Sequence, residues 1–190
     1  MTSERFLVFC SLVTLLSTAP VQVFNGSGFT LSYELNADWS KVTWTLGGQT
    51  TTGWIGIGFG SSIMTDCDIY YGSVTDGTPE LIDAKATKQG KPPADTIQNF
   101  ENLEGTIDGN TTILTFTREL DTSDSQDYVI PLDSPMDVIW AYGDTKYKYH
   151  GERGNTSIVV ATPNAVSELS NTSGFSLSCT LSEDATQATW

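Results

Sequence analysis

The fold is decided by the stretch Gly53-Trp54-Ile55-Gly56-Ile57-Gly58-Phe59-Gly60-Ser61-Ser62-Ile63-Met64-Thr65-Asp66-Cys67-Asp68. Large apolar residues alternate with glycines up to Phe59, which is typical of a buried β-strand whose glycines permit a close approach or a bend. A short polar loop follows and carries Met64, one of three methionines, beside two aspartates. A methionine here is ordinarily a core residue, so the rest of the chain must decide whether it has a chemical role.

The remainder of the chain also has the pattern of β-strands. Phe29, Leu31, Tyr33 and Leu35 alternate with polar residues, the period of a half-buried strand. Comparable runs are predicted at 42–46, 69–74, 81–84, 111–118 and 138–143, separated by turn sequences such as Asp76-Gly77. No stretch has convincing helical periodicity, so the sequence predicts an all-β sandwich or barrel.

An internal repeat indicates the domain organisation. Residues 25–44 align without gaps on residues 171–190, and ten of the twenty positions are identical at an offset of 146. This period is the length of a whole domain. We therefore expect one complete domain over residues 23–163, a linker at 164–170, and the start of a second, truncated copy at 171–190, which makes the chain a fragment of a longer tandem protein.

The N-terminus and the sequons predict export. Residues 1–20 have the features of a secretory signal peptide: a weakly basic start at Arg5, an apolar run over 6–16, and small residues for cleavage at 17–19. Four glycosylation sequons follow, at Asn25, Asn110, Asn155 and Asn171. The predicted location is secreted, or the extracellular face of a membrane protein.

Charge and cysteine content narrow the function classes. The formal net charge of −14 argues against binding to nucleic acid and to anionic membranes. Cys10 is removed with the signal peptide, which leaves Cys67 and Cys179 in different predicted domains. A disulfide framework is therefore not expected in the first domain; Cys67 pairs with Cys179, pairs with a cysteine outside this sequence, or stays a buried thiol.

Several motifs, in order and spacing, resemble one family. They are Gly53–Phe59 followed by Met64, Asp66 and Asp68; Thr115–Leu120 followed by Asp127; Ile139–Gly143; and Tyr149-His150-Gly151-Glu152-Arg153-Gly154. Together they resemble the DOMON family, named after the N-terminal domain of dopamine β-monooxygenase. The resemblance implies an immunoglobulin-like antiparallel β-sandwich.

Some members of that family hold a b-type haem between a methionine and a histidine. Met64 and His150, the only histidine in the chain, match those two positions, so the resemblance implies that they are axial ligands of a haem iron. A thioether and a neutral imidazole are both good axial ligands, and six-coordinate iron favours electron transfer over oxygen activation. We therefore expect an extracellular b-type cytochrome module that transfers single electrons, with no catalytic chemistry of its own.

Other residues are candidates for the surroundings of the haem. Arg153 is a candidate partner for a haem propionate; the alternative is a surface ion pair with Glu152 or another carboxylate. Asp66 and Asp68, with other acids on neighbouring loops, are candidates for a calcium site. No hydrolase nucleophile or zinc motif accompanies these carboxylates. Aromatic residues suited to the walls of the haem slot are Trp54, Phe59, Tyr71, Trp140, Tyr147 and Tyr149.

Two other functions stay open at this point. One is a haem-free binding or adhesion module for a sugar, a small aromatic molecule or a protein. The other is a regulatory domain of a copper monooxygenase. For the cytochrome module, the expected partners are a redox protein, or a fused dehydrogenase or membrane cytochrome domain.

Overall fold

The structure, a computed structural model, describes residues 20–162, 169–170 and 176–177. The predicted signal peptide, Cys10, Cys179, Asn171 and most of the predicted linker and second copy lie outside these residues. The described strands are β1 (Val21–Gly26), β2 (Phe29–Leu35), β3 (Lys41–Gly48), β4 (Trp54–Phe59), β5 (Cys67–Thr75), β6 (Thr78–Ala86), β7 (Glu101–Asp108), β8 (Thr111–Glu119), β9 (Pro135–Gly143), β10 (Glu152–Val159), β11 (Leu169–Ser170) and β12 (Ser176–Leu177).

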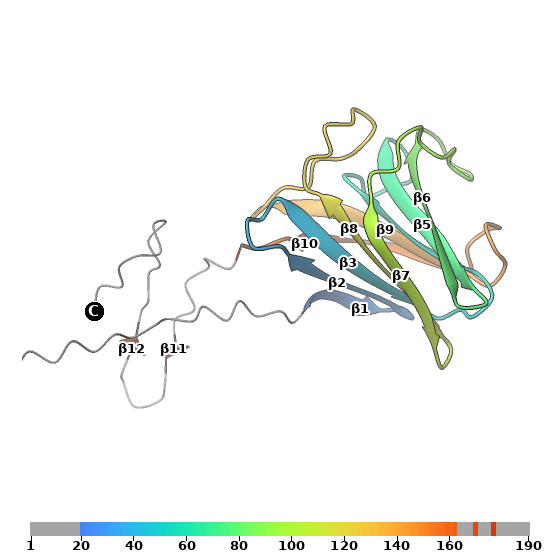
Figure 1. Cartoon of the computed structure of the whole chain (residues 1–190), viewed down its shortest axis with the longest axis horizontal. Helices are drawn as coiled ribbons and strands as arrows, with labels where there is room; N and C mark the ends of the chain where they lie inside the picture. Colours follow the sequence, from blue (N-terminus) through green and yellow to red (C-terminus); the bar gives the residue numbers. More distant parts are fainter. Residues whose placement is uncertain (1–19, 163–168, 171–175, 178–190) are drawn as a thin grey trace, which may run out of the picture.

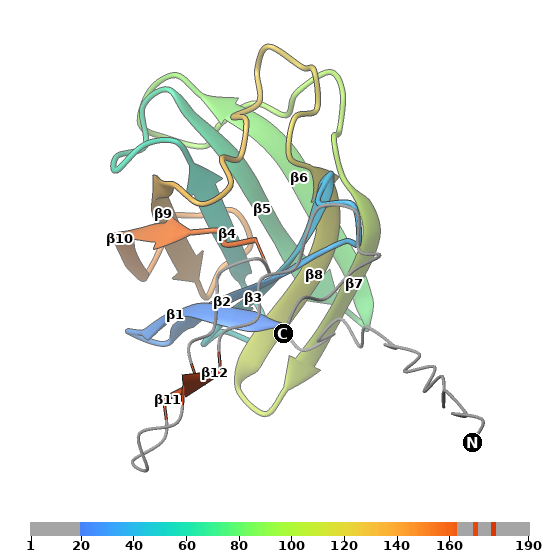
Figure 2. The same cartoon turned by 90° about the vertical axis from the view of Figure 1, so that its left-hand side faces the viewer.

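Ten of these strands form two five-stranded antiparallel sheets. Sheet A has the order β1-β2-β3-β8-β7, and sheet B has the order β10-β9-β4-β5-β6. The two sheets pack face to face as a sandwich (Figure 1), and β4 lies between β9 and β5 in sheet B (Figure 2). The predicted all-β, immunoglobulin-like sandwich is confirmed. Among the described residues no helix is long and apolar enough to cross a membrane.

The core lies between the sheets and follows from the period-two alternation of the strands. Val42, Trp44 and Leu46 of β3 face Ile55, Ile57 and Phe59 of β4, and all six are at most 1% exposed. The Trp44 and Phe59 rings lie 5.0 Å apart, and Trp140 of β9 stacks on Phe29 of β2 at 5.2 Å. This aromatic packing joins the two sheets.

The outer faces of the two sheets differ in chemistry. On sheet A, threonine hydroxyls pair across β3 and β8, Thr43 with Thr117 at 2.8 Å and Thr45 with Thr115 at 3.1 Å. On sheet B, an apolar cluster covers the face opposite the core. A polar outer face is ordinary for an antiparallel sheet, whereas the apolar outer face of sheet B singles it out as a candidate site.

The strands β11 and β12 pair with each other, Leu169 opposite Leu177. These strands lie 146 positions after parts of β1 and β2. The pairing is shifted by one residue from that of β1 and β2, in which Phe24 lies opposite Leu31.

Candidate functional site

Two glycines of β4 remove side chains from the outer face of sheet B. Because Ile55, Ile57 and Phe59 point into the core, Gly56 and Gly58 point outward. A Cβ at Gly58 would lie 2.6 Å from Cys67 Sγ, and one at Gly56 would lie 2.9 Å from Tyr71 Cβ. The centre of this face is therefore a strip of backbone that has no large side chains of its own. Apolar side chains of the neighbouring residues lean over it.

The strip continues onto the neighbouring strands. Ala141 of β9 pairs with Gly56 on one side and with Arg153 of β10 on the other. An apolar cluster borders the strip; its buried members are Cys67, Ile69, Tyr71, Ala84 and Ala86, and the partly buried residues packed on it are Trp54, Met64, Ile82, Ile139 and Tyr147. We call this surface the outer apolar face. Its apolarity is what the site of a large apolar cofactor requires.

Met64 belongs to this face. It lies in the loop after β4 and packs on the cluster, partly buried. Trp54 and Tyr71 also belong to it, with ring centroids 6.4 Å apart, and Tyr147 packs edge-on to Tyr71 at 5.3 Å. The structure thus brings together four of the residues predicted from sequence.

His150 lies near the other end of β4. It stacks with Tyr149, ring centroids 4.2 Å apart, and its Nε2 lies 3.4 Å from Arg153 Nη1. Trp54 adjoins this group, because Trp54 Nε1 and His150 Cα both lie within 3.2 Å of the place that a Cβ on Gly143 would take. Trp54 therefore connects the Met64 cluster to the histidine loop.

Electrostatics keep the His150 imidazole neutral. Burial lowers the pKa of His150, and the positive charge of Arg153 lowers it further. A neutral imidazole binds a metal through its unprotonated nitrogen, and in this structure Nε2 accepts from Arg153 Nη1. The described residues give Arg153 no carboxylate within ion-pair distance, so its charge is free to face an anionic group. Tyr149 is 79% exposed.

Phe59 and Trp140 are placed elsewhere. Both side chains lie in the core between the sheets, where Phe59 packs on Trp44 and Trp140 on Phe29. They point to the opposite side of sheet B from Met64 and Tyr71. The structure does not bring these two residues to the candidate site.

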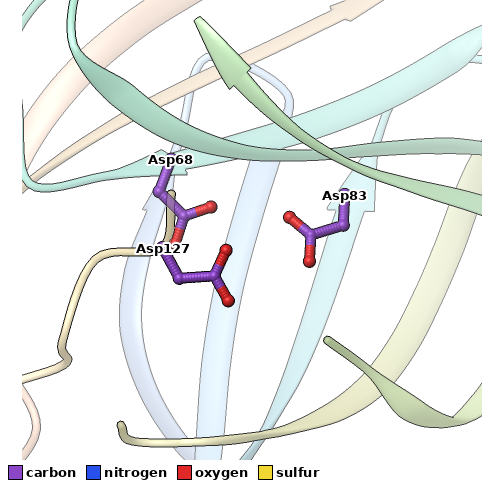
Figure 3. A group of neighbouring side chains, drawn as sticks. All are labelled: Asp68, Asp83 and Asp127. Atoms are coloured by element: carbon purple, nitrogen blue, oxygen red, sulfur yellow. The ribbon is translucent and has the colours of Figure 1, made fainter. Parts of the chain in front are cut away.

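A second cluster lies inside the sandwich and consists of carboxylates. Asp68 of β5, Asp83 of β6 and Asp127 of the β8–β9 loop each place an oxygen within 4.8 Å of the others, and the three side chains point toward one another (Figure 3). Asp66, which was expected beside Asp68, is exposed and is not in this group. Of the two aspartates named from the sequence, only Asp68 belongs to this cluster, and Asp127 joins it from a neighbouring loop.

Arg118 supplies one positive charge to this acidic cluster. Its Nη1 donates to Asp68 Oδ2 at 2.7 Å, and both side chains are fully buried. Burial raises the pKa of Asp68 to about 6 even though Arg118 opposes the shift. Burial also raises the pKa of Asp83 to about 7, with Asp127 and Asp68 adding to the shift.

Sequence reasoning did not select Asp83, although a signal was present. Asp83 follows Leu81 by two positions in β6, so the alternation that buries Leu81 also turns Asp83 inward. A charged residue at an inward position of a strand is rare unless it is paired or binds a metal. Asp68 occupies the same kind of position, two residues before Tyr70 in β5.

Cys67 is a buried thiol with no disulfide partner among the described residues. Its Sγ–H donates to Phe59 O at 3.4 Å. Burial raises the pKa of Cys67 to about 12. The thiol therefore acts as a small apolar side chain beneath Met64.

Solved structures with a similar fold are cytochrome domains. The cytochrome b domain of pyranose dehydrogenase from Coprinopsis cinerea aligns with a TM-score of 0.55 and 16% identity, over 74% of this chain and 87% of that domain. The cytochrome domain of Myriococcum thermophilum cellobiose dehydrogenase aligns with a TM-score of 0.57 and 14% identity, over 76% of this chain and 92% of that domain. At these identities the likeness shows a shared fold.

Proteins that are similar to this chain in sequence are named DBH-like monooxygenase proteins, not cytochromes. DBH-like monooxygenase protein 1 of Homo sapiens is 38% identical over 128 residues, which are 63% of this chain and 21% of the relative. The Mus musculus protein of the same name is 34% identical over 121 residues, 60% of this chain and 19% of the relative. The chain thus spans about a fifth of the length of these relatives.

A family model describes the sandwich itself. The model of the DOMON domain matches residues 25–143, from the end of β1 to the end of β9. This match covers more than half of the chain, and it includes the glycine-rich strand β4 and the Met64 loop. The chain belongs to the DOMON domain family.

Proposed function

We propose that this DOMON domain is an exported b-type cytochrome module that passes single electrons within a larger protein, with Met64 and His150 as the axial ligands of the haem. The observation that carries the proposal is the outer apolar face of sheet B. Met64 packs on this face after one end of β4, and His150 lies beside Trp54 at the other end. The likeness in fold to two cytochrome domains supports it.

The residues present fit a haem. The donors are a thioether and an imidazole whose lowered pKa leaves it neutral. The strip formed by Gly56, Gly58 and Ala141 carries at most one methyl group per residue. The side chains of Cys67, Ile69 and Ile139 lean over it, so a flat macrocycle would meet an apolar surface. A haem held by Met64 and His150 would supply one-electron transfer.

The chain's own residues have separate tasks in this proposal. Trp54 Nε1–H donates to Lys148 O at 3.0 Å and so fixes the loop that carries His150. Tyr71 and Tyr147 form an apolar wall that excludes water. Arg153, without a carboxylate partner among the described residues, is positioned to bind a propionate.

Export and partners complete the proposal. Asn25, Asn110 and Asn155 are exposed, as glycosylation requires, and the predicted signal peptide precedes the domain. Electrons then pass to and from a redox protein, or a dehydrogenase or membrane cytochrome domain of the same polypeptide. The names of the two structural neighbours, each a domain of a dehydrogenase, support the second arrangement.

Absorption spectroscopy tests the haem ligands. The purified chain is mixed with haem, reduced, and compared with Met64→Leu and His150→Ala; Met136→Leu, a change in the core methionine of β9, is the matched control. We expect sharp low-spin bands in the wild type and the control, and loss of these bands in both ligand variants. Because the chain has one histidine, no second imidazole replaces it. Failure of the wild type to bind haem, or bands that both ligand variants retain, contradicts the proposal.

A second candidate function follows from the names of the sequence relatives. The match to DBH-like monooxygenase proteins favours a haem-free accessory domain of a copper monooxygenase. In this case Met64 and Tyr147 only complete the apolar packing of sheet B. Met64→Leu then leaves stability and partner activity almost unchanged, and the wild type shows no haem bands, so the same spectra separate the two functions.

A further inference from the structure

The outer apolar face of sheet B is covered by protein on one half. Over β5 and β6 lies the loop between β6 and β7, where Tyr71 Oη donates to Pro92 O at 3.2 Å. Ala84 of β6 forms a β-bridge with Ala94 of the same loop and is fully buried. Among the described residues no hydrogen bond or bridge fastens a loop over the middle of β9, where Ile139 stays partly exposed.

Asn155 of β10 points toward this uncovered half. Ile158 of the same strand lies in the core, and a Cβ at Gly154 would lie 2.5 Å from the core residue Trp140. Side chains of a strand alternate between its two faces. Asn155 lies between these inward positions, so it points outward, and the residue is exposed.

The register of sheet B places Asn155 at the end of a row of apolar residues. Asn155 lies opposite Ile139 of β9, Ile139 lies opposite Gly58 of β4, and Gly58 lies opposite Ile69 of β5. Directly opposed residues have Cβ atoms about 4.5–5.5 Å apart, and Gly58, two strands away, is about 10 Å from Asn155. A group attached to Asn155 therefore meets Ile139 first and the glycine strip next.

The sequence supplies such a group. Asn155, Thr156 and Ser157 form a glycosylation sequon, and β10 is an edge strand, so no further strand crowds a sugar there. Modification forms a bond from Asn155 Nδ2 to C1 of the first sugar, breaks the bond of that sugar to the diphosphate of a lipid-linked donor, and releases a proton.

The chemistry of the first sugar suits this position. N-acetylglucosamine has an acetyl methyl group and C–H groups on its ring, which can pack on the Ile139 side chain, and hydroxyls that stay in water. An uncovered apolar patch is a site of association or aggregation, whereas a glycan is bulky and solubilising. A sugar on Asn155 would therefore remove apolar surface from contact with water.

Two other sequons of the described residues lie elsewhere. Asn110 is in the turn between β7 and β8, and Asn25 is in β1. These strands belong to sheet A. Of the three sequons that the structure describes, Asn155 is thus the one on the outer apolar face, and Asn110 offers a matched control.

We propose that Asn155 carries an N-linked glycan whose first sugars cover the β9–β10 half of the outer apolar face, as the β6–β7 loop covers the β5–β6 half. The inference rests on the export proposed above, but it concerns the haem-free chain and does not depend on haem binding. The glycan keeps this face from associating with other apolar surfaces.

Secretion of the chain from a glycosylating host cell tests the proposal. Mass spectrometry of the glycopeptides measures the occupancy of each site, and fluorescence of anilinonaphthalene sulfonate measures the apolar surface of the haem-free chain. Asn155→Gln and Ser157→Ala remove the sequon at different atoms, while Ser157→Thr keeps it. Asn110→Gln removes a glycan from the distant turn. Far-ultraviolet circular dichroism checks that each variant is folded.

The expected results separate a cover on this face from a general effect of sugar. The wild type is modified at Asn155; dye fluorescence rises in Asn155→Gln and Ser157→Ala and stays at the wild-type level in Ser157→Thr and Asn110→Gln. Adding Ile139→Ser to Asn155→Gln removes the rise, which locates the dye.

Two outcomes overturn the proposal by itself. They are an unmodified Asn155 beside a modified Asn110, and equal dye fluorescence in the wild type and the variants that lack the Asn155 sequon. Absence of every glycan also contradicts the proposed export, whereas a chain that binds no haem contradicts only the cytochrome function.

Discussion

Arg118 of β8 and Asp68 of β5 form an ion pair that crosses the sandwich, with Nη1 and Oδ2 2.7 Å apart and both side chains fully buried. Arg118 also donates to Tyr128 O at 2.8 Å and lies over the Tyr70 ring, 5.4 Å from its centroid. One side chain thus joins sheet A, sheet B and the β8–β9 loop.

Removing Arg118 is expected to be costly. In Arg118→Met the Asp68 charge stays buried without its partner, which typically destabilises a protein by about 3–5 kcal/mol. Urea denaturation followed by tryptophan fluorescence measures the change in unfolding free energy. The control is Lys41→Met, which breaks the exposed Lys41–Glu101 pair and should have a far smaller effect; similar losses in the two variants contradict this prediction.

The stability of the domain should depend on pH in an unusual direction. In the folded state the pKa of Asp68 is raised to about 6 and that of Asp83 to about 7. Raised carboxyl pKa values mean that the folded state binds protons more tightly than the unfolded state, so stability is greatest at low pH and is lost as pH rises toward 7. Thermal unfolding should show a Tm at pH 8 lower than that at pH 5 by on the order of 5 °C.

Asp83→Asn provides the check on that pH dependence. The amide cannot ionise, so the fall in Tm between pH 5 and pH 8 should shrink. An unchanged pH profile would show that Asp83 is not its source.

The two faces of sheet B should respond differently to substitution. Phe59→Leu removes packing on Trp44 in the core and should lower the unfolding free energy by about 1–3 kcal/mol without moving the haem bands. Tyr71→Leu changes the outer apolar face and should alter haem affinity more than stability. Spectra and denaturation curves of both variants, measured together, check this separation; a haem spectrum sensitive to Phe59→Leu would contradict it.

Gly53 should tolerate no side chain. A Cβ there would lie 1.6 Å from Gly143 O, a backbone atom of β9. Gly53→Ala must therefore separate the ends of β4 and β9, and we expect a loss above about 2 kcal/mol. Gly77 is the comparison: its φ of +74° strains an alanine, but the space around it is open, so Gly77→Ala should cost about 1 kcal/mol.

Much of the fold was predictable because the central strands are strongly patterned. β2, β3, β4, β5, β8 and β9 alternate or carry long apolar runs. Three edge strands, β1, β7 and β10, were not predicted. β7 and β10 bury one face only weakly and have polar sequences. An edge strand forms by pairing with its one neighbouring strand, so its own sequence need not show the alternation of an inner strand.

The candidate site was partly predictable. Alternation along β4 separates Trp54 from Phe59, because positions 54 and 59 differ by an odd number and fall on opposite faces. This parity was available in the sequence and places Phe59 in the core. Trp140 required the register of β9 against β4, in which Trp140 pairs with Ile57. The acidic cluster required the packing of a loop residue, Asp127, against two strands, which no local pattern encodes.

The first and last strands of the sandwich, β1 and β10, both lie at sheet edges. A pulling force applied at the two ends of the domain would act first on β1 and β10. It would break their hydrogen bonds to the neighbouring strands one at a time, and would act on the inner strands last. β1 and β10 should therefore detach at low force, while the inner strands, with the Met64 loop and the buried carboxylates, hold. Stretching single molecules should reveal this as an early, small extension ahead of the main rupture.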